Sequence, residues 1–268
     1  MHNLSTLPIP GMDLTVEPTP PPALHAAPRR IYESPLATVY EGRAEHVLPM
    51  LPTESVDLIA TDPPYGVNWQ SRRRTEKFDQ LDGDGADQAD RDTIAGIMAE
   101  CVRLVRQHRH LYVFGPTDVL DGLKVSDVVS LIWDKGTLGS GDVTSAWGPA
   151  HEPISFTVSK HRHAGKAGKP VLPTRLRKGS VLSYTRPTGR NVRHPSEKPV
   201  PLMRELIESS SRQGETILDP FAGSGSTAVA AILTGRKVIT IESSPKYAAM
   251  TVERIKAAEA LVAKINAV

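Results

Sequence analysis

Apolar residues along most of this chain fall into short runs of strand length, which alternate with longer segments of helical periodicity. Five runs rich in Val, Ile and aromatic residues predict strands at 37–40, 56–60, 111–115, 128–133 and 154–158. Residues 92–106 place apolar side chains at 3.6-residue spacing, which predicts an amphipathic helix. Strands that alternate with helices favour an α/β fold, with a mostly parallel sheet and helices on both faces.

The same alternation continues to the C-terminus. The pattern predicts, in order, a helix over 200–211, a strand over 216–218, a helix over 226–234, a strand over 237–241 and a last helix from Pro245 to about residue 267. Pro245 suits the first turn of its helix, because an N–H at that position would have no partner within the helix.

Two segments interrupt the alternation. Residues 1–29 contain seven prolines, which predicts a disordered or polyproline tail. Residues 160–193, here called the basic insertion, contain several Gly and Pro and no long periodic segment, which predicts a loop or small subdomain. The chain is therefore divided into the tail, a first half of the α/β domain at 30–159, the basic insertion, and a second half at 194–268.

Charge gives the basic insertion a candidate role. It holds ten Lys and Arg with no Asp or Glu, whereas the rest of the chain carries 22 basic and 30 acidic residues. A basic segment in an acidic body indicates a local surface for a polyanion, and nucleic acid is the expected partner. The residues assigned to this surface are Lys160, Arg162, Arg175, Arg177, Lys178, Arg186, Arg190 and Arg193, with Arg72, Arg73 and Arg74 from a second loop at 68–85.

Composition excludes several other classes. The chain of 268 residues has no apolar run of about 18 residues and no N-terminal signal pattern, so neither a membrane span nor secretion is expected. A single cysteine, Cys101, excludes an intramolecular disulfide and a Cys-rich zinc site, and its place on the apolar face of a predicted helix indicates a core residue. The expected setting is a reducing cytoplasm, with no metal ion.

A glycine-rich turn follows the predicted strand at 216–218. The turn reads Asp219-Pro220-Phe221-Ala222-Gly223-Ser224-Gly225 and runs into a helix. Its glycines are expected to permit a tight turn and to leave space for a ligand at the helix N-terminus. Glu242 ends the next strand, 19 residues after Gly223, where it could accept hydrogen bonds from ribose hydroxyls.

A second motif, Asp62-Pro63-Pro64-Tyr65, follows the predicted strand at 56–60. Two prolines fix the directions of the Asp62 carboxylate and the Pro63 carbonyl, and Tyr65 offers a flat face beside them. Two acceptors and a stacking ring fit a planar group that carries an exocyclic NH2. The alternative interpretation of this motif is a stiff turn that leaves a strand.

Together these motifs resemble the DNA amino-methyltransferases, which methylate N6 of adenine or N4 of cytosine with S-adenosylmethionine. The resemblance covers about residues 30–268, and 62–65 are similar to the family's catalytic motif and 219–225 to its cofactor motif. Weaker similarities are Leu131-Ile132-Trp133-Asp134-Lys135, His151-Glu152-Pro153-Ile154 and His194-Pro195-Ser196-Glu197-Lys198-Pro199. The catalytic motif precedes the cofactor motif, which is the permuted order of the β group.

The resemblance implies a Rossmann-like S-adenosylmethionine-dependent fold, with Asp62 to Tyr65 catalytic. It assigns 219–225, Glu242 and Lys198 to the cofactor, double-stranded DNA as partner with a flipped target base, and a homodimer as a further expectation. Asp62 as the first catalytic residue favours adenine N6, with cytosine N4 as the alternative. One position departs from the family pattern, because Arg43 stands where Asp is usual near the cofactor's adenine.

Three other interpretations stay open at this point. Gly223-x-Gly225-x-x-Ala228 also satisfies the dinucleotide fingerprint of a nicotinamide dehydrogenase, but that reading gives no role to 62–65 or to the basic insertion. A methyltransferase acting on RNA or on a protein glutamine would present a similar planar NH2. A DNA-binding module without catalysis is the third, and the intact motifs argue against it.

Overall fold

Nine strands of this computed structural model form one sheet, in the order β1-β2-β9-β8-β3-β4-β6-β5-β7. The structure describes residues 27–64, 88–137, 146–159, 178–187, 194 and 196–267, with only the backbone of 88–90. The strands are β1 (Arg29–Glu33), β2 (Ala37–Glu41), β3 (Val56–Thr61), β4 (Val105–Phe114), β5 (Val129–Asp134), β6 (His151–Val158), β7 (Val181–Ser183), β8 (Thr216–Asp219) and β9 (Lys237–Glu242).

The middle of the sheet is parallel, as the sequence predicts. Strands β2, β9, β8, β3 and β4 are mutually parallel, whereas β6 lies antiparallel between β4 and β5, and β1 is antiparallel to β2. All six residues of β3 are buried, which is typical of a parallel strand covered on both faces.

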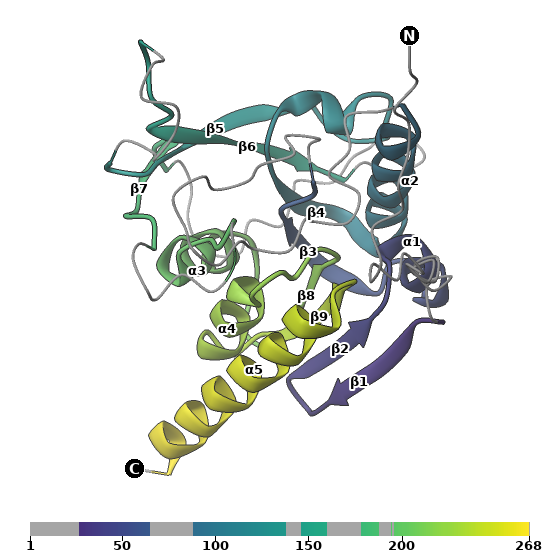
Figure 1. The fold of residues 1–268 in the computed structure, drawn as a ribbon, viewed down its shortest axis with the longest axis vertical. Coiled ribbons are helices and arrows are strands. Elements are labelled where there is room, and N and C mark those ends of the chain that lie inside the picture. Colours follow the sequence, from purple (N-terminus) through teal and green to yellow (C-terminus); the bar gives the residue numbers. More distant parts are fainter. Residues whose placement is uncertain are drawn as a thin grey trace, which may run out of the picture.

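Helices cover both faces of the sheet (Figure 1). Helices α3 (Val200–Ser210), α4 (Ser226–Leu233) and α5 (Pro245–Asn266) pack on one face, and α1 (Ala44–Val47) and α2 (Gln88–Leu104) pack on the other. Two short 3₁₀ helices, η1 (Leu48–Met50) and η2 (Thr117–Leu120), lie on the α2 face. The layers are therefore helix, sheet and helix.

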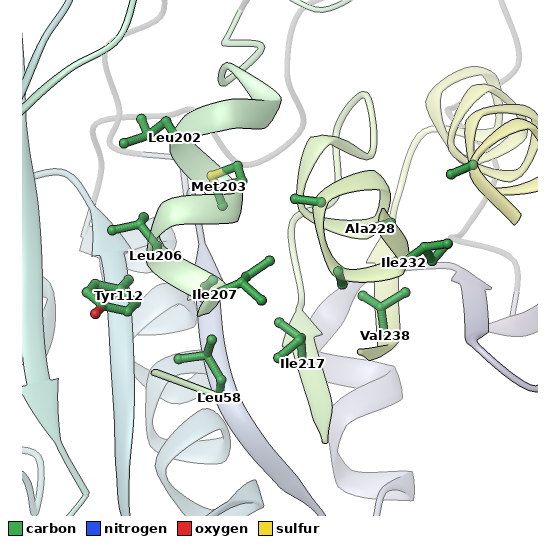
Figure 2. Packing of buried hydrophobic residues seen from close by; sticks show 14 of the residues in the cluster. Leu58, Tyr112, Leu202, Met203, Leu206, Ile207, Ile217, Ala228, Ile232 and Val238 are labelled. Atoms are coloured by element: carbon green, nitrogen blue, oxygen red, sulfur yellow. The ribbon is translucent and has the colours of Figure 1, made fainter. Parts of the chain in front are cut away.

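Alternation along the strands separates two hydrophobic cores. In β3, Leu58 and Ala60 belong to the core under α3 and α4, whereas Ile59 between them belongs to the core under α2. Figure 2 shows part of the first core, where apolar residues of α3 and α4 lie with apolar residues of the strands, among them Leu206, Ile232, Leu58 and Ile217. Cys101 is fully buried in the second core, as predicted.

Three boundaries differ from the sequence prediction. Helix α2 ends at Leu104 and β4 begins at Val105, not at 111, because Val105 is buried and pairs with Val56 of β3. The tail prediction extended to residue 29, but Arg29 already pairs with Glu41 in the β1–β2 ladder, and residues 1–26 lie outside the described part. The basic insertion contributes β7, which pairs with β5, so its described residues are part of the main sheet.

The chain connections place a crevice between β8 and β3. The chain leaves β8 toward α4 and β9 on one side, and leaves β3 toward α2 and β4 on the other, with α4 and α2 on opposite faces. Ligands of open α/β sheets bind where the strand order reverses in this way, at the carboxyl ends of the strands. Both sequence motifs, 62–65 and 219–225, begin at that edge.

Candidate active site

A buried hydrogen bond joins the two motifs. The Thr61 hydroxyl donates to Asp219 Oδ1 at 2.8 Å, and the Phe221 backbone N–H donates to the same oxygen at 3.1 Å. Burial raises the pKa of Asp219 to about 6, against the hydrogen bonds from Thr227 and Thr61. The carboxyl group therefore ties the start of the glycine turn to the residue before Asp62.

Side chains of the protein itself pack closely against the glycine turn. Gly223 has φ +51° and Gly225 has φ +78°, which confirms the predicted turn. A Cβ on Gly223 would lie 3.3 Å from the His194 ring, and a Cβ on Gly225 would lie 2.9 Å from Thr251 Oγ1. An added side chain at either glycine would therefore meet the protein's own residues, whereas the expected approach of the glycine backbone to a ligand stays a prediction.

Glu242 holds the turn from the next strand. Its two carboxylate oxygens accept hydrogen bonds from the backbone N–H groups of Gly223 and Ser244, each at 2.8 Å. Burial raises the pKa of Glu242 to about 7, although these backbone donors favour the charged form. A carboxylate with two oxygens has about four acceptor positions, so these two bonds leave room for further donors such as ribose hydroxyls.

Two pockets share Phe221 in their lining, and each contains residues of both motifs. The first is lined by Pro64, Glu242 and Arg43, among other residues. Arg43 forms an ion pair with Glu45, which lines the same pocket. The unusual arginine thus lies in the pocket that the resemblance assigns to the adenine of the cofactor.

The second pocket contains the candidate catalytic carboxylate. Its lining includes Asp62, Phe114, His194, Lys198 and Gly223. The buried His194 ring packs edge-on against Tyr247 at 4.4 Å between ring centroids, and burial, with a smaller contribution from the nearby Lys198 charge, lowers the pKa of His194 to about 4. A neutral imidazole therefore lies next to the glycine turn at neutral pH.

Lys198 contacts the catalytic motif directly, although the sequence resemblance assigned it to the cofactor. Its Nζ donates to Asp62 Oδ2 and to Glu152 Oε1, both at 2.7 Å, and Lys135 Nζ lies 3.0 Å from Glu152 Oε2. Sequence reasoning gave Glu152 and Lys135 no role. The available signal was that both fall within the weak middle motifs of the resemblance.

Most residues assigned to nucleic acid lie outside the described part of the chain, as does Tyr65. This applies to Arg72, Arg73 and Arg74 and, within the basic insertion, to Lys160, Arg162, Arg175, Arg177, Arg190 and Arg193. Arg186 follows β7 and is partly buried, and Lys178 forms an ion pair with Glu205 of α3. The positive charge of Lys178 is therefore paired with a carboxylate of the protein itself.

Within the described ranges, no group of three or more His, Cys, Asp or Glu side chains could hold a metal ion. No helix in the same ranges is both long and apolar enough to cross a bilayer.

The strand order, the glycine turn closed by an acid from the next strand, and the Asp-Pro-Pro motif at the same edge define the class of S-adenosylmethionine-dependent methyltransferases. A profile of the DNA methylase family for N6 and N4 methylation matches residues 56–253. The chain belongs to this DNA methylase family.

Curated relatives support the same family. The DNA adenine methyltransferase YhdJ of Escherichia coli (strain K12) is 28% identical over 252 residues, which cover 82% of this chain and 83% of that protein. The putative methylase YubD of the same strain is 30% identical over 227 residues, 82% of this chain and 90% of that protein.

Solved structures share the fold. The M1.HpyAVI complex with S-adenosylmethionine has a TM-score of 0.58 at 22% identity, over 82% of this chain and 99% of that one. The cytosine-N4-specific PvuII DNA methyltransferase has a TM-score of 0.64 at 16% identity, over 84% and 88% of the two chains. The protein is thus an S-adenosylmethionine-dependent DNA methyltransferase, as the sequence predicts.

Proposed function

We propose that this protein methylates N6 of adenine in double-stranded DNA, with Asp62, Pro63, Pro64 and Tyr65 as its catalytic motif. The observation that carries the proposal is the placement of Asp62 and Gly223 in one pocket at the strand-order reversal between β3 and β8. A target amine at Asp62 is then next to the turn that would hold the methyl donor.

The transfer needs positioning more than covalent catalysis. S-adenosylmethionine supplies an electrophilic methyl on a sulfonium. The Asp62 carboxylate and the Pro63 carbonyl accept hydrogen bonds from the two amine protons, which favours a pyramidal nitrogen and directs its lone pair at the methyl. The nitrogen lone pair forms the new N–C bond while the sulfonium S–CH3 bond breaks and leaves its electron pair on the sulfur of S-adenosylhomocysteine. The proton lost by the amine passes to water. Electrostatic stabilisation by fixed acceptors is the main contribution of the protein.

The residues proposed for the cofactor are Asp219, Pro220, Phe221, Ala222, Gly223, Ser224, Gly225 and Glu242. Glu242 fits the ribose hydroxyls, because it lines a pocket together with Pro64 and Phe221. His194 and Gly223 line the second pocket together with Asp62, which suits the methionine part of the same ligand. The ligand would then extend across Phe221 from one pocket to the other.

The enzyme cannot reach the target amine while its base is paired and stacked in duplex DNA. The base must therefore leave the stack, at a cost of a few kcal/mol. Stacking on Tyr65 is worth about 1–3 kcal/mol and offsets much of that cost. The basic insertion and Arg72, Arg73 and Arg74 are proposed to bind the phosphate backbone. A homodimer and a cytoplasmic location complete the proposal.

Adenine is favoured over cytosine on two grounds. Asp62 stands where the resembling adenine enzymes commonly have Asp, and one relative, YhdJ, is named a DNA adenine methyltransferase. The fold itself does not discriminate, because a cytosine-N4-specific enzyme shares it.

Nucleoside mass spectrometry tests the proposal. Duplex DNA of mixed sequence is incubated with the protein and methyl-deuterated S-adenosylmethionine, then digested to nucleosides. The proposal predicts labelled N6-methyl-2′-deoxyadenosine, and labelled N4-methyl-2′-deoxycytidine alone would refute the base assignment. An Asp62→Asn variant at the same concentration controls for contaminating methyltransferases.

A further inference from the structure

Four charged side chains from four separate chain segments meet in one cluster, and Asp62 is one of them. The central one is Lys198, which is 8% exposed and precedes α3. Its Nζ lies 2.7 Å from Asp62 Oδ2, after β3, and 2.7 Å from Glu152 Oε1, in β6. Lys135, after β5, contacts the far oxygen of Glu152 at 3.0 Å. Positive and negative charges therefore alternate along the series Lys135, Glu152, Lys198 and Asp62.

Two buried aromatic rings also lie close to the Lys198 ammonium. Its Nζ lies 4.8 Å from the ring centroid of Phe114 and 5.9 Å from that of Trp133, both fully or almost fully buried. A buried ammonium is costly unless it is paired, and here two carboxylates and two aromatic faces surround it. Burial opposes the charge, yet the two carboxylates raise the pKa of Lys198 above its usual value.

Resting on the proposed function, we propose that Lys198 and Glu152 are positioning residues that hold Asp62 as an ionised, correctly aimed acceptor for the target amine. Lys198 fixes one oxygen of Asp62, and a carboxylate has about four acceptor positions, so the amine can still be received. Glu152 fixes Lys198, and Lys135 fixes Glu152.

This arrangement decides where the proton of the methylated amine goes. An ammonium in contact with Asp62 favours the charged carboxylate, which makes Asp62 a strong hydrogen-bond acceptor but a weak proton acceptor. The proton released after N–C bond formation is therefore passed to water and not retained on Asp62. An acceptor that stays charged through the reaction is ready for the next amine.

The test compares the pH dependence of kcat in two variants that change charge in opposite directions. Lys198→Met removes the positive charge beside Asp62, so Asp62 protonates more readily and the acid limb of kcat moves up by about 1–3 pH units. Glu152→Gln removes a negative charge and leaves Lys198 to Asp62 alone, so the acid limb moves down. A purely structural role would lower kcat at every pH without opposite shifts.

Other titratable groups near Asp62 are controlled by the design of the measurement. The groups that face it or its partners are Lys198, Glu152, Lys135, His194 and Asp219. Saturating S-adenosylmethionine and DNA remove effects on binding. Lys237→Met removes the same charge at an exposed position at the amino end of β9, whereas the site lies at the carboxyl ends of the strands. Lys237→Met is expected to leave the profile unchanged.

Cofactor affinity separates this inference from the sequence-based assignment of Lys198. We expect Lys198→Met to change the dissociation constant for S-adenosylmethionine by less than threefold, while kcat at pH 7 falls at least tenfold. A large loss of cofactor affinity with an unmoved acid limb would overturn the inference. If Lys198→Met does not fold, Glu152→Gln alone tests the inference. A kcat that is at least tenfold lower, with an acid limb that is unchanged or shifted upward, would then overturn the inference.

The two hypotheses fail differently. If the wild-type protein methylates no DNA base, the proposed function is wrong. If the wild-type protein methylates DNA and both variants keep its pH profile, only the positioning role is wrong.

Discussion

Gly225→Ala tests whether the glycine turn exists for the ligand or for the fold. Gly225 precedes α4 with φ +78°, where an alanine costs about 1–2 kcal/mol. Its Cβ would also lie 2.9 Å from Oγ1 and 3.0 Å from Cγ2 of Thr251, which is fully buried in α5. Overpacking of this kind adds about 1–3 kcal/mol. We therefore expect Gly225→Ala to lower the free energy of unfolding by about 2–5 kcal/mol.

The assay is urea unfolding without cofactor, followed by far-UV circular dichroism. Gly96→Ala is the matched control, because Gly96 is exposed in α2, a Cβ there would meet nothing within 4 Å, and we expect a gain of about 0.5–1 kcal/mol. In a Thr251→Ala background the two closest atoms are gone, so the cost of Gly225→Ala should fall to about 1–2 kcal/mol. Unchanged stability with weaker cofactor binding would refute the reasoning and assign the glycine to the ligand.

Three further predictions concern the cofactor, the DNA and the flipped base. Because burial raises the pKa of Glu242 to about 7, protonation of this residue stabilises the folded, unliganded protein at low pH, and this contribution is lost as pH rises through about 7. If ribose hydroxyls bind the carboxylate, the affinity for the cofactor should rise over the same pH range. Calorimetry of Glu242→Gln should show neither trend. Replacing four arginines of the basic insertion by Gln should flatten the log–log salt dependence of duplex binding by about 3–4 units, whereas an unchanged slope would remove this segment from the DNA interface. The four are Arg175, Arg177, Arg190 and Arg193. Tyr65→Ala should weaken binding of DNA with an unpaired target base by about 1–3 kcal/mol and Tyr65→Phe should not, as measured by fluorescence anisotropy; equal losses would exclude stacking.

The sequence predicted the parts of the fold whose periodicity is strong and local. The strands after residues 55, 215 and 236 are short apolar runs with clear ends, and the structure places them within about one residue of the prediction. β4 was predicted too short because Arg106 to Arg109 are polar, and the structure begins the strand at Val105, which pairs with Val56 of β3. β7 was missed because three residues carry too little periodicity.

The candidate site was predicted only as far as local motifs reach. Asp62 and Gly223 could be found because each follows a strand with a characteristic turn. Their link through Thr61 and Asp219 spans 158 residues, and the contact of Lys198 with Asp62 spans 136. Contacts at such separations depend on the order of strands in the sheet, which a single sequence does not specify.

The measurement that tests the central claim most directly is methyl transfer by Asp62→Asn at saturating S-adenosylmethionine and DNA, with cofactor binding measured in parallel. Asn keeps the size of the side chain and removes its charge, so it weakens the acceptor for the amine without emptying the site. The account predicts a fall in kcat of about 10²–10³-fold, with the dissociation constant for S-adenosylmethionine within about threefold of wild type. Near-normal turnover by Asp62→Asn would contradict the account, because the amine would then be positioned by another residue.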